Sequence, residues 1–314
     1  MPETNDTIEV EHKITKKGII LDSQVLTTLM SCARLTDYRF NLHLQPLNGK
    51  SKSLEMGSIV HKILEVFYQN QIKGFKRDVS IQGGFAAGMT FIAGCKHCSD
   101  FIPTDEQPKP VCGHQIDEYP GVSLGDDDIK TTLDTMEQYF EHYRNDSWVP
   151  LEIETTKGKV LYEDDEIRIL WKAKLDLIAD TGQGIFSVDH KTMSQRRDTL
   201  SLNNQFIGQC HVMGTRGVLI NKIGFQKSLK PADKFTRVLI SYSANRLLEW
   251  QSSILPYWVK LMLMFDESGY FPPNFTHCEN KYGFCMFKGV CEADEHMREE
   301  ELKLHFKVGS KWDV

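Results

Sequence analysis

Two aspartates and a lysine in the middle of the chain have the types and spacing of a metal-dependent hydrolytic site. Asp176 precedes a short glycine-containing break, residues 181–184, and Asp189 and Lys191 follow it. If the flanking segments pair as antiparallel strands around this break, Asp176 lies directly across from Asp189, and Lys191 projects from the same face as Asp189. Carboxylates bind Mg²⁺ or Mn²⁺, and a nearby ammonium can position water or stabilise a phosphate under attack. An ordinary cross-strand ion pair would use the same residues, so other segments must decide.

A histidine and a glutamine lie on two segments that could reach these carboxylates. His61 follows Gly57 in a stretch with helical spacing, where the apolar stripe comprises Ile59, Val60, Ile63, Leu64, Val66 and Phe67. His61 lies almost opposite this stripe, so it is an exposed helix histidine or a metal ligand. Gln205, on an expected helix after the lysine strand, could hold water or a phosphate oxygen.

Taken in chain order, Gly57-x-x-x-His61, Asp176, Asp189-x-Lys191 and Gln205 resemble the motif series of the PD-(D/E)XK nuclease superfamily. The resemblance is to its RecB-like exonuclease branch, in particular phage-type relatives of the CRISPR-associated adaptation exonuclease, and extends over about residues 26–291. It implies an α/β fold with a restriction-endonuclease-like core, in which helices flank a mixed central sheet.

The resemblance also implies roles for individual residues. The metal would be held by His61, Asp176, Asp189 and the main-chain carbonyl of His190. Lys191 would be the catalytic lysine, and Gln205 would orient DNA or water. The family helix usually reads Q-x-x-x-Y, whereas this chain has Gln209 at the fifth position.

Four of the eight cysteines form a second candidate site: Cys32, Cys278, Cys285 and Cys291. The first 17 residues are polar and charged, which predicts an intracellular protein, and clustered cysteines there bind metal or pack in a core more often than they form disulfides. In the resembling branch, one N-terminal and three C-terminal cysteines hold a [4Fe–4S] cluster. Zinc is the main alternative. A C-terminal segment, residues 270–296, would thus be paired with Cys32.

A different group of cysteines lies in a predicted insertion, residues 80–120. Cys95, Cys98, Cys112 and His114, with His97 as an alternate, have the spacing of a structural zinc site. The competing interpretation is a reduced loop without metal. Cys210, on the Gln205 helix, is expected to be a packed core residue.

Composition fits one globular domain, residues 1–314, but does not identify its partner. The chain is 40% hydrophobic and 25% charged, with a net charge of −6. This charge excludes a uniformly basic surface but not local DNA-binding patches, for which the candidates are Arg196, Arg197, Lys222, Lys227, Lys230, Lys234 and Arg237. No transmembrane span is expected, because the apolar run 259–265 is short and contains a lysine.

Periodicity predicts most of the regular elements. Helices are expected at residues 23–40, 57–71, 128–143 and 244–266, the last bent at Pro256, with a further helix around Gln205. Strands are expected at 151–156, 159–163, 167–178, 184–191 and 236–242. In the first of these, Glu152 and Glu154 alternate with apolar residues and could face the site or solvent; solvent is the default expectation.

The residues and the resemblance together predict a Mg²⁺- or Mn²⁺-dependent DNA exonuclease. The resemblance implies that its substrates would be single strands or DNA ends in prokaryotic or phage recombination, repair or processing. It would act in the cytoplasm of a bacterial cell or phage-infected host, alongside other recombination or replication proteins. The alternatives are a non-catalytic DNA-binding subunit and a structure-specific endonuclease.

Overall fold

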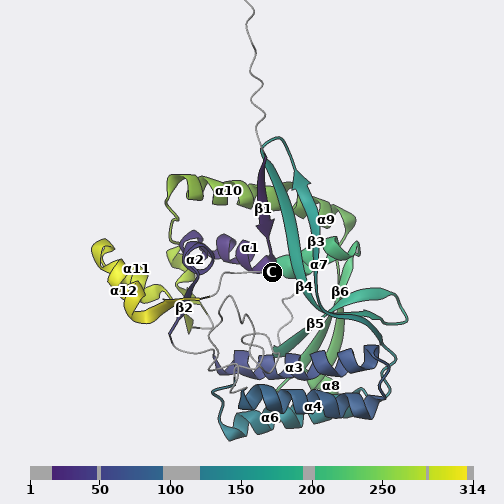
Figure 1. Ribbon diagram of the computed structural model, residues 1–314. Coiled ribbons are helices and arrows are strands. Elements are labelled where there is room, and N and C mark those ends of the chain that lie inside the picture. Colours follow the sequence, from purple (N-terminus) through teal and green to yellow (C-terminus); the bar gives the residue numbers. More distant parts are fainter. Residues whose placement is uncertain (1–15, 48–50, 95–120, 194–201, 281–282, 310–314) are drawn as a thin grey trace, which may run out of the picture.

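A mixed six-stranded sheet forms the centre of the protein, whose computed structural model describes residues 16–47, 51–94, 121–193, 202–280 and 283–309 (Figure 1). The sheet order is β1-β4-β5-β6-β7, and β3 pairs with the other side of β4. The β1–β4 and β5–β6 pairs are parallel and the others are antiparallel. The strands are β1 (Lys17–Leu21), β3 (Val149–Glu163), β4 (Ile167–Asp180), β5 (Ile185–Met193), β6 (Gly217–Gly224) and β7 (Phe235–Ser241).

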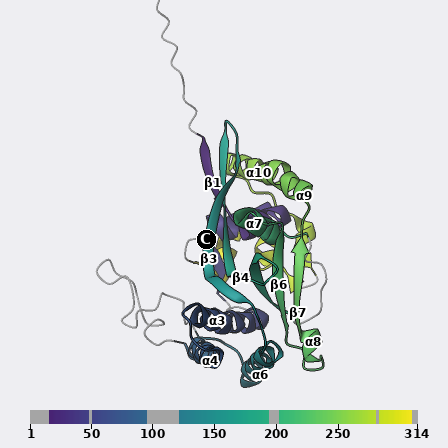
Figure 2. The same cartoon turned by 90° about the vertical axis from the view of Figure 1, so that its right-hand side faces the viewer.

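Two groups of helices bury the two faces of this sheet (Figure 2). The first group comprises α1 (Ser23–Ser31), α7 (Asn204–Met213), α9 (Ala244–Glu249) and α10 (Leu255–Ser268), and the second comprises α3 (Lys52–Ile72), α4 (Arg77–Ala93) and α6 (Asp126–His142). Adjacent residues of β6 show the division, because Ile220 packs with the first group and Leu219 with the second. This arrangement confirms the predicted α/β fold with a restriction-endonuclease-like core.

Strand β4 changes its neighbour at the position of the candidate site. Along one side it pairs with β3 for most of its length. On the other side it pairs with β1 over Ile167–Trp171 and with β5 over Leu177–Asp180. Asp176 lies next to the second of these pairings, where the sheet forks. Such a fork leaves a strand side chain accessible without removing it from the rigid sheet.

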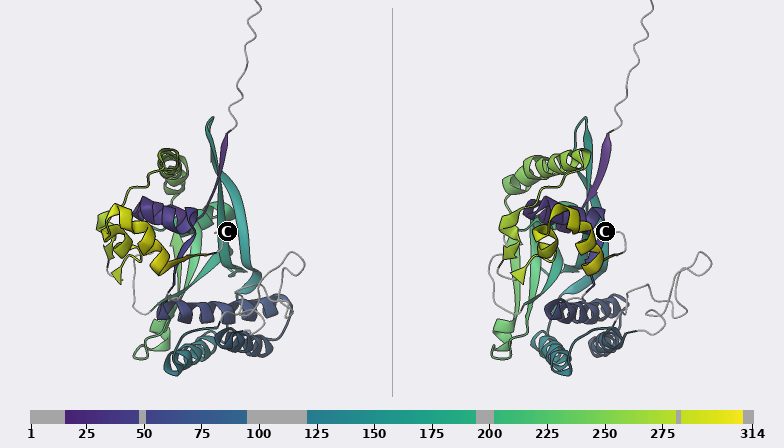
Figure 3. Two further views of the ribbon diagram at one scale, coloured as in Figure 1. Left: turned by 60° about the vertical axis from the view of Figure 1, so that its left-hand side comes forward. Right: turned by 90° about the vertical axis from the view of Figure 1, so that its left-hand side faces the viewer.

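The end of the chain folds back onto its beginning. Residues 274–308, which we call the C-terminal cap, contain β8 (Glu279–Asn280), β9 (Gly283–Phe284), α11 (Lys288–Glu292), α12 (Arg298–His305) and β10 (Phe306–Val308). Strand β10 pairs with β2 (Leu44–Pro46), and the rings of Tyr38 and Phe287 lie 5.0 Å apart. Figure 3 shows the yellow cap beside the purple N-terminal helices.

Several elements differ from the sequence predictions. The expected helix 23–40 is interrupted at Cys32, whose extended backbone separates α1 from α2 (Ala33–Thr36) and a π-helical turn, Asp37–Asn41. The two expected strands before residue 163 are one strand, β3, because Gly158 continues the pairing. The expected bend at Pro256 is instead a π-helical turn at Trp250–Ile254, and Pro256 fits the first turn of α10.

Some elements were not predicted at all. They include β1, β6, α4, the short helix α8 (Pro231–Lys234), and β2 with the helices and strands of the C-terminal cap. Helix α4 includes the first part of the predicted insertion and packs along α3. None of the helices in the described part of the chain is long and apolar enough to cross a membrane.

Candidate active site

The hairpin between β4 and β5 places the two aspartates beside each other. Leu177 pairs with Val188, so the next step of the register sets Asp176 level with Asp189, as the symmetric turn predicts. The main-chain N–H of His190 donates a hydrogen bond to Asp176 Oδ2 at 2.8 Å. Pairing between neighbouring strands therefore fixes both the position and the orientation of the Asp176 carboxylate.

Asp189 is held by groups from β5 and α7. Its carboxylate is buried, and Lys191 Nζ lies 2.9 Å from Oδ2. Gln205 Nε2 donates to Asp189 Oδ1 at 2.6 Å, and Lys191 Nζ donates to Gln205 Oε1 at 3.1 Å. Asp189, Lys191 and Gln205 thus form a closed triangle. Gln209, which replaces the family tyrosine, also points its amide at Asp189 Oδ1, at 3.4 Å.

Helix α3 brings His61 to the other side of Asp176. His61 Nδ1 lies 3.7 Å from Asp176 Oδ2, and its side chain is partly exposed. The helix can approach the sheet this closely because Gly57 lacks a side chain; a Cβ there would lie 2.9 Å from Thr192 Oγ1. The Gly57-x-x-x-His61 spacing therefore has a physical reason, since one turn separates the close approach from the histidine.

Glu154 is a site residue that the sequence analysis assigned to solvent by default. Potential ligand atoms of His61, Glu154 and Asp176 all lie within 4.8 Å of one another. The default assignment was wrong because Glu154 lies across from Asp176 in the pairing of β3 with β4. Its backbone has φ 47°, a left-handed conformation that costs a non-glycine residue about 1–3 kcal/mol. Glu152, by contrast, forms an exposed ion pair with Lys157 as expected for a surface residue.

A signal for Glu154 was present in the sequence. The strands β3 and β4 are joined by a short turn after Glu163, and the same symmetric-hairpin argument used for Asp176 and Asp189 places Glu154 level with Asp176. The observed pairs Ile153 with Leu177 and Thr155 with Leu175 agree. What the sequence could not show is the left-handed backbone at this position.

The electrostatics of this group favour a cation. Burial raises the pKa of the Asp176 carboxyl, His61 opposes this rise, and the neighbouring Asp189 charge adds to it. Glu154 contributes a third carboxylate, and its Oε2 already contacts the ammonium of Lys174 at 2.8 Å. Two or three carboxylate oxygens with an imidazole nitrogen are a donor set suited to Mg²⁺ or Mn²⁺.

The side chain of His190 anchors the strand from the opposite face. Its ring is buried and stacks on Tyr68 of α3 at 5.8 Å. The Asn221 amide nitrogen lies 2.9 Å from both His190 Nδ1 and the hydroxyl of Tyr139. Burial lowers the pKa of His190 well below its usual value, so the ring stays neutral. This network fixes the backbone of His190, whose N–H holds Asp176.

The four cysteines of the second predicted site lie around one pocket. Cys32 comes from the break after α1, and the other three come from the C-terminal cap. The main-chain N–H of Asn274 donates to Cys32 Sγ at 3.3 Å. Burial raises the pKa of Cys278 and Cys285, and neighbouring thiols of the same set raise it further. Cys210 is fully buried in the core, as predicted.

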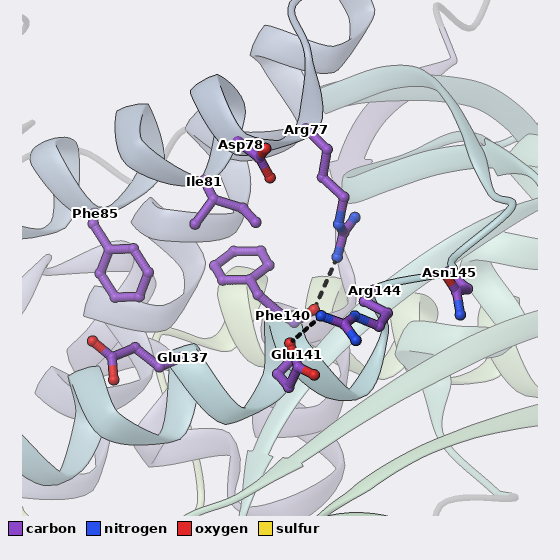
Figure 4. A pocket seen from close by; sticks show the side chains of 9 residues that line it. All are labelled: Arg77, Asp78, Ile81, Phe85, Glu137, Phe140, Glu141, Arg144 and Asn145. Atoms are coloured by element: carbon purple, nitrogen blue, oxygen red, sulfur yellow. Dashed lines mark hydrogen bonds and ion pairs between the residues drawn. The ribbon is translucent and has the colours of Figure 1, made fainter.

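Two further regions are the predicted zinc site and a pocket between α4 and α6 that lies apart from both groups of residues described above. Cys95, Cys98, Cys112 and His114, the predicted zinc ligands, lie outside the described residues, as do Arg196 and Arg197. A pocket of about 400 Å³ opens between α4 and α6 (Figure 4). There Arg77 donates to the carbonyl oxygens of Phe140 and Tyr143 near the end of α6, a structural role, and none of the predicted site residues lines the pocket.

Comparison with known families identifies the superfamily of the chain. Residues 23–212, more than half of the chain, match the PD-(D/E)XK nuclease superfamily. The chain belongs to this superfamily. The matched region contains every residue of the site at the strand fork, and it ends before the three cysteines of the C-terminal cap.

Two solved structures resemble this superfamily member over much of its length. A crystal structure named "Putative exonuclease", from Eubacterium rectale, has 13% identity and a TM-score of 0.42, and the alignment covers 87% of this chain and 90% of that one. The crystal structure of SSO0001 has 13% identity and a TM-score of 0.31, and the alignment covers 52% of this chain and 69% of that one. These similarities are too distant to carry a functional argument. No curated protein matches the chain.

Proposed function

We propose that this protein is a metal-dependent deoxyribonuclease that acts as an exonuclease on single strands or DNA ends. The observation that carries the proposal is the convergence of His61, Glu154 and Asp176 within 4.8 Å, beside the Asp189–Lys191 pair. The three ligands come from three different elements, α3, β3 and β4, and meet at one fork of the sheet. A surface ion pair would not require this convergence.

The proposed metal site consists of His61, Glu154 and Asp176, together with Asp189 and the main-chain carbonyl of His190. When Mg²⁺ or Mn²⁺ is bound, it supplies positive charge to the scissile phosphate and makes water more acidic. Lys191 donates hydrogen bonds toward the attacking water or the phosphate. Gln205 accepts from Lys191 and donates to Asp189, so it holds the lysine and the carboxylate in their relative positions.

A nuclease assay tests this proposal. Anaerobically purified protein is incubated with linear or circular single-stranded DNA and Mn²⁺ or Mg²⁺, beside Lys191→Ala. We expect cleavage of linear DNA only, and none in the variant. Cleavage of circles would replace the exonuclease with a structure-specific endonuclease. A protein that binds DNA but cleaves none with either metal would be a non-catalytic subunit.

We also propose that Cys32, Cys278, Cys285 and Cys291 hold a [4Fe–4S] cluster. Among the described residues, His61, Glu154 and Asp176 are the one group of three or more ligands within 4.8 Å, so no three of these sulfurs approach that closely. The four cysteines line one pocket, and four thiolates are the usual shell of such a cluster. Zinc is the alternative, because four thiolates also suit a single zinc ion.

Metal analysis separates these assignments. Anaerobic protein should contain about four iron atoms per chain. One zinc per chain that is lost in Cys32→Ser would replace the cluster with zinc. Zinc that is lost in Cys95→Ser but retained in Cys32→Ser would support the proposed Cys95, Cys98, Cys112 and His114 site.

We also propose that the protein acts in the cytoplasm of a bacterial cell or phage-infected host, with DNA and recombination or replication proteins as partners.

A further inference from the structure

The face of β4 that carries Asp176 continues as a row of lysines. Side chains alternate along a strand, so Asp176, Lys174 and Lys172 project from the same face at two-residue intervals. Lys174 confirms this orientation, because its Nζ reaches Glu154 Oε2 at 2.8 Å, and its side chain is 61% exposed. The row therefore begins at the metal site and leads away from it along the strand.

The opposite face of the same hairpin is covered by α7. Lys159 Nζ donates to the carbonyl of His211 at 3.2 Å, and Trp171 lies against Gly208. Gly158 and Lys172, which alternate with Lys159 and Trp171, therefore face away from α7. They pair across the two strands.

The residues opposite the lysines are small. Thr156 pairs with Lys174 and Gly158 pairs with Lys172. A Cβ at Gly158 would lie 3.7 Å from Lys172 Cγ, an ordinary contact, so the Lys172 stem lies beside a position that has no side chain. The lysines thus border a low strip of backbone that could admit an extended polymer.

We propose that Lys174 and Lys172 bind successive phosphates of the DNA strand that occupies the active site. This inference rests on the proposed nuclease function. An ammonium has three donors, so Lys174 can keep its contact with Glu154 and still donate to a phosphate next to the metal site. Lys172 lies two residues farther along the strand, about 7 Å away.

The charge of the protein makes local basic groups important for DNA binding. With a net charge of −6, the chain as a whole does not attract DNA, so basic groups near the site are expected to contribute to affinity. The partly exposed Lys174–Glu154 pair contributes little to folding stability. Its position beside the metal ligands is better explained by substrate binding.

Salt-dependent DNA binding tests the proposed phosphate contacts of Lys174 and Lys172. Fluorescence anisotropy with a labelled single-stranded oligonucleotide is measured between about 50 and 200 mM salt. The Lys191→Ala background prevents cleavage. In that background, Lys174→Ala and Lys172→Ala should each weaken binding and reduce the slope of log K against log salt by about 0.7. Lys159→Ala is the matched control, since this lysine lies on the same hairpin but faces α7, and it should leave the slope unchanged.

A substitution that keeps both lysines provides a second test. Gly158→Asp places a carboxylate beside Lys172 without a steric clash, and it should weaken DNA binding about as much as Lys172→Ala does. If the slope of log K against log salt is the same in every variant, the proposed phosphate contacts of Lys174 and Lys172 are wrong, while the nuclease assignment stands. If the unsubstituted protein neither binds nor cleaves DNA, the nuclease assignment itself is wrong.

Discussion

The candidate active site at the sheet fork and the cysteine pocket under the C-terminal cap are built in different ways. Strand pairing and helix packing hold the active-site groups, and they contact one another directly at 2.6 to 3.7 Å. The cysteines come from segments more than 240 residues apart, as in the Asn274–Cys32 contact. Strands and helices can build the first site without metal, whereas a cofactor that bridges the cysteines would itself join the chain ends.

The largest expected effect tests the new ligand of the preformed site. Glu154→Gln removes one carboxylate charge from the proposed metal ligands and should lower Mn²⁺ affinity by more than about 100-fold. This loss would exceed the effect of removing a residue that only supports a metal ligand. Glu152→Gln, two residues away in an exposed ion pair, should change it less than about twofold. Isothermal calorimetry with Mn²⁺ measures both. Equal affinities in the two variants would remove Glu154 from the site.

The second prediction concerns the cysteine pocket. Cys32→Ser should abolish iron binding and expose the C-terminal cap to limited proteolysis, because a ligand of the proposed cluster is lost. Cleavage activity per folded molecule should persist, because the active site uses other elements. Cys210→Ala is the control: it should retain all iron and cost about 1 kcal/mol of stability. Full iron content in Cys32→Ser would disprove the assignment of this ligand.

A third prediction separates support of the active site from general packing. Asn221→Leu breaks the contact to His190 and should lower Mn²⁺ affinity roughly 10–100-fold, as loss of an outer-shell partner does. Ile223→Val, two residues along β6 in the same core, should cost about 0.5–1.5 kcal/mol of stability without altering metal affinity. The two variants should therefore diverge in calorimetry even if their melting temperatures agree.

The smallest expected difference lies between the two glutamines of α7. Gln205 contacts Asp189 at 2.6 Å and also binds Lys191, whereas Gln209 contacts Asp189 at 3.4 Å. Gln205→Ala should reduce the cleavage rate about tenfold, the equivalent of one charged hydrogen bond. Gln209→Ala should reduce it about twofold or threefold. A larger loss in Gln209→Ala would assign the main positioning role to Gln209.

The sequence predicted the parts of the site that depend on local periodicity. The symmetry of the turn predicts that Asp176 lies across from Asp189. The apolar stripe of its helix predicts that His61 lies on the opposite side of that helix. Hairpin symmetry could have placed Glu154 beside Asp176, but no pattern of residue types reveals its left-handed backbone conformation. Strand β6 was missed because its apolar run, Val218–Ile220, is too short to distinguish a strand from a helix. The break at Cys32 follows from long-range contact with the cap.

One measurement tests the central claim most directly: the rate at which the protein releases nucleotides from linear single-stranded DNA in Mn²⁺, compared with Asp176→Asn. Our account predicts metal-dependent cleavage by the unsubstituted protein that chelation abolishes. It predicts a loss of at least about 100-fold in Asp176→Asn, with an unchanged fold. Equal rates in the two proteins, or cleavage that survives chelation, would contradict a metal site at the fork of the sheet.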